Sequence, residues 1–106
     1  MKAFHSEQAI KDKYLGRVAE HRKADRLIRG TGWENGRGCA VGCTLEKYDH
    51  KAYETELGIP QILARLEDRL FENLPVDVAM LWPERFLAAI NPGADLSLVW
   101  PKFAVW

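Results

Sequence analysis

Apolar residues recur at helical spacing in the first third of the chain. The residues that would share one face of this helix are Ile10, Tyr14, Val18, His21 and Ile28. Ser6 is suited to cap the helix start, because its hydroxyl can accept a hydrogen bond from a free N–H group of the first turn. The pattern predicts a helix that runs to about Arg29 and is ended by Gly30 and Gly32.

Prolines divide the second half of the chain. Pro60 suits the first position of a helix, and a turn is predicted at residues 91–93. Because proline disfavours a helical conformation in the preceding residue, we expect Trp82 and Trp100 at corners between helices. The predicted helices are Lys51–Leu57, Pro60–Asn73, Asp77–Trp82, Pro83–Ile90 and Leu96–Trp106. Residues 96–99 and 103–106 are also compatible with strands.

A glycine-rich segment over residues 31–44 separates the two helical parts. It has no clear period, which predicts a structured loop with one short helical turn at about residues 39–45. Asn35 and Gly36 form a turn pair that tolerates positive φ, and Gly36, Gly38 and Gly42 would let the backbone approach another group closely. We therefore interpret this segment as a packing device between helices.

Together these elements predict an all-α fold. We expect one compact domain over residues 1–106, with about five to six helices, several of them short and opened by proline. The apolar share of 47% suits a globular domain with one core. No apolar run approaches the roughly 18–20 residues that span a bilayer, and the first residues lack a signal-peptide core. We therefore expect a cytoplasmic protein without a membrane partner.

The charges cancel over the whole chain but are unevenly distributed. Fifteen basic and fifteen acidic side chains argue against a protein built mainly to neutralise phosphate or an anionic membrane. Residues 1–30 carry eight Lys/Arg against four Asp/Glu, whereas residues 54–106 carry four against eight. Nucleic-acid binding through the basic first helix is thus an alternative. It is less favoured because the basic residues are not interleaved with aromatic residues for base stacking.

Two cysteines offer a second alternative, a metal- or thiol-dependent site. Cys39 and Cys43 lie four residues apart, and His50 and His21 would complete a four-ligand set. The spacing matches no strong zinc pattern, and nothing in the sequence identifies a group that would orient His50 beside a reactive thiol. Small buried apolar residues in a tight turn are the simpler interpretation of both cysteines, so we predict no cofactor.

Several segments resemble an uncharacterised family of small bacterial and phage-associated proteins, and the similarity extends over the whole chain. The segments that carry the resemblance are Trp33–Thr44 (WENGRGCAVGCT), Tyr53–Pro60 (YETELGIP), Phe4–His5, Arg65–Asp68 and Trp100–Phe103. The resemblance implies no activity and gives no residue a role. Members of this family continue past the position of Trp106, which implies that the chain is the N-terminal part of a longer parent or a short member.

Our leading hypothesis is a non-enzymatic module that binds another protein. Aromatic and arginine side chains are common anchors of protein interfaces. The residues predicted to bind the partner are Trp33, Arg37, Arg22, Arg26, Arg29, Trp100 and Trp106. The partner is an unidentified protein, and the sequence leaves a homo-oligomer open. By analogy with the phage-associated family, one specific form of this hypothesis is inhibition of a host protein.

Overall fold

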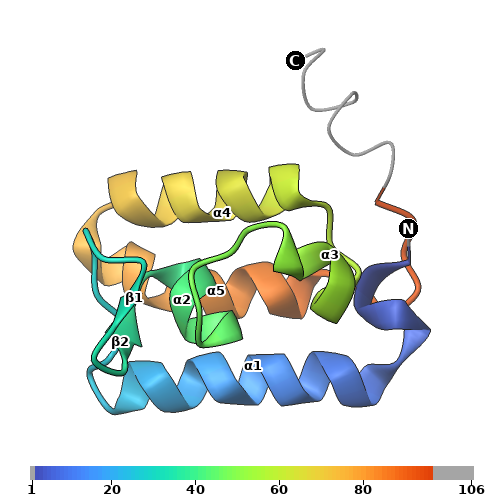
Figure 1. The fold of residues 1–106 in the computed structure, drawn as a ribbon, viewed down its shortest axis with the longest axis horizontal. Coiled ribbons are helices and arrows are strands. Elements are labelled where there is room, and N and C mark those ends of the chain that lie inside the picture. Colours follow the sequence, from blue (N-terminus) through green and yellow to red (C-terminus); the bar gives the residue numbers. More distant parts are fainter. Residues whose placement is uncertain (1, 97–106) are drawn as a thin grey trace.

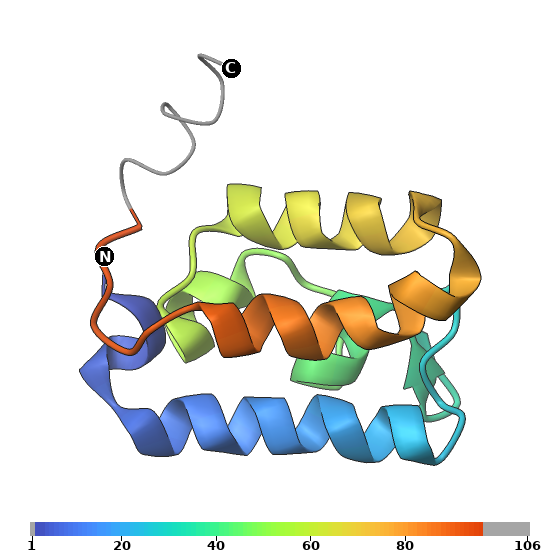
Figure 2. The same ribbon diagram turned by 180° about the vertical axis from the view of Figure 1, so that it is seen from behind.

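Four helices close a ring around the apolar core in the structure, a computed structural model that describes residues 2–96 (Figure 1). Helix α1 (Gln8–Lys23) contacts α2 (Ala40–Leu45) and α5 (Val76–Ala89), and α4 (Gln61–Asn73) contacts both of these. In the view of Figure 2, α5 lies in front, between α1 and α4. The 3-10 helix Ala3–Ser6 and helix α3 (Ala52–Leu57) pack together beside this ring.

Every helical segment contributes to one core. The large, fully buried side chains come from the 3-10 helix and from α1 to α5, and include Phe4, Val18, Val41, Tyr53, Phe71 and Leu87. The described part of the chain holds five α-helices and one two-stranded hairpin, so the prediction of a compact, mostly helical domain is confirmed. None of the described helices is both long enough and apolar enough to cross a membrane.

The first helix is shorter than predicted at both ends. Ser6 has a left-handed conformation (φ 61°) and does not cap α1, and Asp25 (φ 58°) lies just beyond the end of the helix, well before Arg29. The chain leaves the helix early because Leu27 pairs with Gly38: the Ile28 N–H donates to the Gly38 carbonyl at 2.8 Å. A tertiary contact therefore ends this helix before the two glycines do.

The glycine-rich segment contains a hairpin that the sequence pattern did not predict. Strand β1 (Trp33–Glu34) pairs with β2 (Arg37–Gly38), and the two residues between them have φ values of 55° and 74°. Positive φ at both turn residues is the geometry of the tightest hairpin turns, and Asn-Gly is the pair that adopts it most readily. The turn at Asn35–Gly36 is thus confirmed, while strands of two residues are too short to give an alternating pattern.

Helix α2 packs directly on the backbone of this hairpin. The Gly32 carbonyl oxygen lies 2.0 Å from where a Cβ would stand at Gly38 and 1.7 Å from where one would stand at Gly42. The Cys39 N–H, at the start of α2, donates to the carbonyls of Thr31 (2.8 Å) and Gly32 (3.2 Å). The predicted helical turn and the predicted close approach at Gly38 and Gly42 are both confirmed. The close approach predicted at Gly36 is wrong, because nothing lies within 4 Å of its Cβ position and this glycine serves the turn instead.

The second half of the chain differs from its prediction at one proline. Residues 76–89 form the single helix α5 with the buried Pro83 inside it, so the two predicted helices are one and Trp82 is not at a corner. A proline inside a helix costs about 3 kcal/mol. Burial of Ala79, Pro83 and Leu87, and a 3.0 Å hydrogen bond from the Trp82 indole to the Glu67 carbonyl, oppose that cost.

The other predicted elements of this half are found close to their predicted bounds. Helices α3 and α4 are both present, with Gly58 (φ 66°) ending α3 and Pro60 at the N-cap of α4 rather than at its first position. The turn at residues 91–93 is closed by a hydrogen bond from the Ala94 N–H to the Asn91 carbonyl. The helix or strands predicted beyond Leu96, and the corner at Trp100, lie outside the described residues.

Two helical glycines provide a matched test of this packing. Gly42→Ala should destabilise the fold by about 2–3 kcal/mol, because its Cβ would overlap the Gly32 carbonyl. Gly16→Ala in α1 should stabilise it by about 0.5–1 kcal/mol, because nothing lies within 4 Å of its Cβ position and alanine favours a helix. Urea unfolding followed by circular dichroism measures both changes. Equal stability of Gly42→Ala and the parent would contradict the close approach.

Candidate functional site

A groove between α4 and α5 is the most distinctive surface feature of the described chain. It encloses a cavity of about 220 Å³, and every described side chain that lines it is apolar. These side chains are Leu63, Leu66 and Leu70 from α4, Trp82 and Phe86 from α5, Ile90 at the C-cap of α5, and Leu96 from the segment that follows. The volume is below the roughly 300–1,000 Å³ of small-molecule pockets, so the groove is suited to a few apolar side chains.

The two walls of the groove follow from helical spacing. On α5, Trp82, Phe86 and Ile90 are each four residues apart and share one face of the helix. The Trp82 and Phe86 rings pack at 5.7 Å between their centroids, and the Trp82 indole is held to the Glu67 carbonyl of α4. The aromatic wall is therefore fixed to the opposite helix, and the groove is a preformed feature of the fold.

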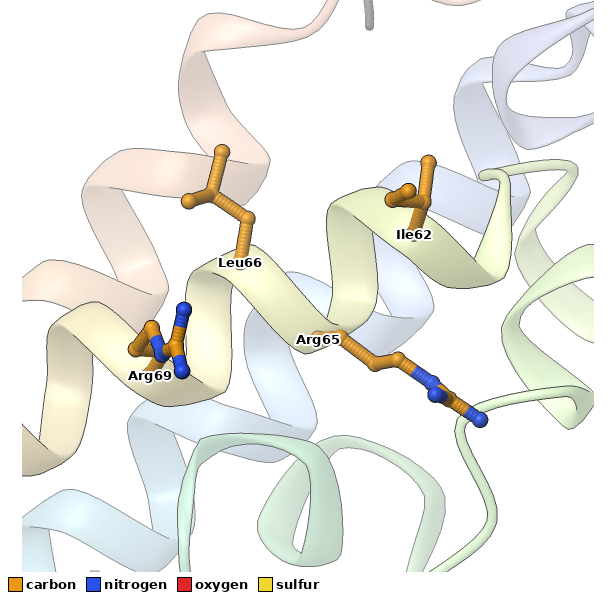
Figure 3. A pocket seen from close by; sticks show the side chains of 4 residues that line it. All are labelled: Ile62, Arg65, Leu66 and Arg69. Carbon is orange, nitrogen blue, oxygen red and sulfur yellow. The ribbon is translucent and has the colours of Figure 1, made fainter.

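The outward surface of α4 next to this groove carries both apolar and basic side chains. Figure 3 shows Ile62 and Leu66 pointing to the same side of the helix, with Arg65 and Arg69 one turn apart along it. These four residues line a second hollow of about 340 Å³. Leu66 belongs to both hollows, so the apolar groove and the arginine-bearing surface are continuous.

Exposed apolar side chains also lie on α5 near the groove. Val78 is 40% exposed and Leu81 38% exposed, and Val76 at the start of the helix reaches 63%. Single exposed apolar residues are common on protein surfaces, whereas a contiguous apolar patch marks an interaction site. Of these three, Val78 lies one helical turn before the groove residue Trp82 and extends the apolar face of α5 on that side.

Three of the four arginines predicted to bind a partner are engaged within the fold. Arg22 forms an ion pair with Glu84 at 2.6 Å, and the Arg26 guanidinium donates to His21 Nδ1 at 2.9 Å. Arg29 donates to the Glu72 and Leu74 carbonyls at the end of α4, where a helix favours positive charge. This basic cluster therefore joins α1 and the chain after it to α4 and α5.

The predicted aromatic contacts have mixed positions. Trp33 is partly buried and meets the His21 ring edge-on, with 5.3 Å between the ring centroids. Arg37 is exposed on the hairpin. Trp100 and Trp106 lie outside the described residues. Of the predicted binding residues, Arg37 is thus one that the structure leaves exposed, on strand β2.

The cysteines and histidines of the proposed metal or thiol site face different partners. The Cys43 thiol donates to the Gly38 and Arg26 carbonyls, and the Cys39 thiol faces Asp68. His50 Nε2 also lies near Asp68, at 3.4 Å, whereas His21 Nε2 lies 3.4 Å from Glu46. Within residues 2–96, no three His, Cys, Asp or Glu side chains come together in a way that could hold a metal ion.

Both cysteines are reduced and buried, and burial controls their chemistry. It raises the pKa of Cys39 well above its usual range, with the neighbouring Asp68 carboxyl adding to the rise. Burial also raises the pKa of Cys43 to about 11, although the Gly38 backbone acts in the opposite direction. A thiol must ionise to act as a nucleophile or a ligand, so this environment suppresses both roles.

Two buried carboxyl groups on α4 were missed by the sequence analysis. Glu67 is fully buried and accepts a 2.8 Å hydrogen bond from the Tyr53 hydroxyl, and Asp68 accepts one from Tyr48 at 3.0 Å. Each carboxyl has one buried oxygen without a hydrogen-bond partner. The signal for Glu67 was its position three residues after Ala64 and four before Phe71, on the core face of α4.

Burial is the largest influence on Glu67 and raises its pKa to about 8. The hydrogen bond from Tyr53 acts in the opposite direction, and the Asp68 carboxylate adds to the rise. The Glu67 carboxyl is therefore protonated at neutral pH, which removes the cost of burying a charge. It serves the core, because its side chain faces Tyr53 while its carbonyl holds the Trp82 wall of the groove.

No family model, curated protein or solved structure matches this chain. The resemblance to a phage-associated family therefore stays a prediction.

The buried carboxyl predicts a specific dependence of stability on pH. The unfolded chain loses this proton near pH 4.5 and the folded chain near pH 8, so stability should fall as pH rises between these values. In Glu67→Gln the decrease in the free energy of unfolding over this pH range should be smaller by roughly 3–5 kcal/mol. Urea unfolding from pH 4 to 9 measures this difference. Glu20→Gln on the exposed side of α1 is the control. A parallel pH profile for Glu67→Gln and the parent would contradict a buried neutral carboxyl.

The thiols should be inert in the folded protein. At pH 8, iodoacetamide should modify both cysteines at least about a hundredfold more slowly than in the denatured chain, because they are buried and their pKa values are raised. Mass spectrometry of intact protein follows the labelling. Rapid labelling of Cys39 in the native state would instead support the thiol-dependent site.

Proposed function

We propose that this protein is a protein-interaction module whose α4–α5 groove receives an apolar segment of a protein partner. The observation that carries the proposal is the wholly apolar lining of the groove, with Trp82 and Phe86 on one wall and Leu66 and Leu70 on the other. Grooves between helices commonly receive the apolar face of a partner helix. The shape and lining of this groove support that mode of binding.

The alternatives draw less support from the same contacts. A thiol- or metal-dependent site would use Cys39 and Cys43, whose thiols are buried with raised pKa values. Nucleic-acid binding would use basic residues such as Arg22 and Arg29, which are engaged by Glu84 and by the end of α4. We place this protein in the cytoplasm on the sequence alone, and inhibition of a host protein rests on the family resemblance alone.

Two partly buried leucines on different faces make a matched test. Leu66→Gln should weaken capture of a partner at least about tenfold, because it places an amide in the centre of the groove. Leu15→Gln in α1 has similar exposure and should leave capture unchanged. Tagged parent and variants are incubated with a bacterial lysate, and bound proteins are quantified by mass spectrometry.

Urea unfolding confirms first that both variants fold. The supporting result is a protein retained by the parent and by Leu15→Gln but lost with Leu66→Gln. The same bound proteins in all three samples would show that the groove does not bind them, and the proposal would then be wrong.

A further inference from the structure

The arginines of α4 and α5 differ from those of the first part of the chain. Arg65 and Arg69 on α4, and Arg85 on α5, are exposed, and none of their side chains forms a hydrogen bond, an ion pair or a ring contact within the described structure. They are the three basic residues between positions 54 and 96, a segment that holds eight acidic residues. Two of these three, Arg65 and Arg69, line the hollow that shares Leu66 with the groove, and Arg85 directly precedes the groove residue Phe86.

The acidic residues of the two helices lie elsewhere. On α4, Glu67 and Asp68 are buried, and the Glu72 carboxyl accepts from the Gly30 N–H. On α5, Glu84 pairs with Arg22, and Asp77 lies seven residues earlier on the same side of the helix. The acidic side chains of these helices therefore do not neutralise the three arginines, which are available to a partner.

The groove also has a defined length. Its walls extend from Leu63 to Leu70 on α4 and from Trp82 to Ile90 on α5, which corresponds to about 10–12 Å along each helix. An occupant of this length has about two helical turns in contact. It would present apolar residues at positions i, i+3 or i+4, and i+7.

We infer that the groove takes an amphipathic helix of a protein partner, with acidic side chains beside its apolar stripe. This inference rests on the proposed function and names the chemistry of the partner. The apolar stripe would enter the groove, and the acidic side chains would meet Arg65 and Arg69 in the hollow that shares Leu66 with the groove. Guanidinium groups bind carboxylates with paired hydrogen bonds, which gives the pairing specificity as well as affinity.

Two other occupants fit the observations less well. An anionic membrane would also attract the arginines, but the apolar lining is recessed between two helices, where side chains can enter and a bilayer surface cannot. Residues 97–106 of the chain itself are rich in apolar side chains, but their one charged side chain is Lys102. They have no acidic side chain to complement the arginines.

Designed peptides test the inference on the full chain. Three fluorescent peptides of about 14 residues share one helical backbone composition. The first has the apolar stripe flanked by Glu, the second has the same stripe flanked by Lys, and the third has the residues of the first in an order that destroys the stripe. We expect the Glu-flanked peptide to bind at least about tenfold more tightly than either other peptide in fluorescence anisotropy, and binding should weaken as salt is added.

Charge reversal provides the matched variants. The double variant Arg65→Glu/Arg69→Glu should bind the Glu-flanked peptide at least about tenfold more weakly and the Lys-flanked peptide more tightly than the parent does. Both positions are exposed on α4, and urea unfolding confirms that the variant folds. Arg37→Glu reverses an exposed arginine on the hairpin and should leave the binding of both peptides unchanged.

Other outcomes overturn the inference in distinguishable ways. If the Glu- and Lys-flanked peptides bind equally and Leu66→Gln abolishes both interactions, the groove is a docking site but the inference of an acidic partner is wrong. Binding to phosphatidylserine vesicles without binding to any peptide would identify a membrane surface instead. Binding of the acidic peptide only after Trp100→Ala/Phe103→Ala substitution would identify the end of the chain as the occupant. Binding of no peptide under any of these conditions would also overturn the inference.

Discussion

The contact between the Gly32 carbonyl and helix α2 is the constraint on which the rest of the fold depends. Helix α2 lies in the ring between α1 and α4, so its position sets the spacing of both. It reaches this position because Gly38 and Gly42 have no Cβ where the carbonyl lies. The same packing buries the two cysteines beside these glycines. The segment therefore has a structural role, although cysteine is a potentially reactive residue type.

A second constraint connects the core to the groove. Glu67 occupies an inward position of α4, where burial keeps its carboxyl protonated and the Tyr53 hydroxyl donates to it. The carbonyl of the same residue accepts the indole hydrogen of Trp82 and so holds one wall of the groove. The surface that we propose to bind a partner is therefore supported by hydrogen bonds at a single residue of the core.

The arginines of the chain serve two different purposes. Arg22 forms an ion pair with Glu84 on α5, and Arg29 donates to a carbonyl at the end of α4. These contacts hold the helices together. The Arg65, Arg69 and Arg85 side chains have no such partner in the described structure, and Arg65 and Arg69 line the hollow beside the apolar groove. An unpaired guanidinium next to apolar surface attracts an acidic amphipathic segment. The second set of arginines therefore favours an acidic partner in the proposed interaction.

The sequence alone determined the features that depend on local preference: the helical stripe of α4, the turn at Asn35–Gly36 and the close-packed glycines. Tertiary structure decided the early end of α1 at its contact with Gly38, the continuation of α5 through Pro83, and the groove itself. These features depend on which surfaces meet, and side-chain spacing within one helix does not contain that information. For the same reason the sequence showed which arginines are present, and only the fold separated those with internal partners from those without.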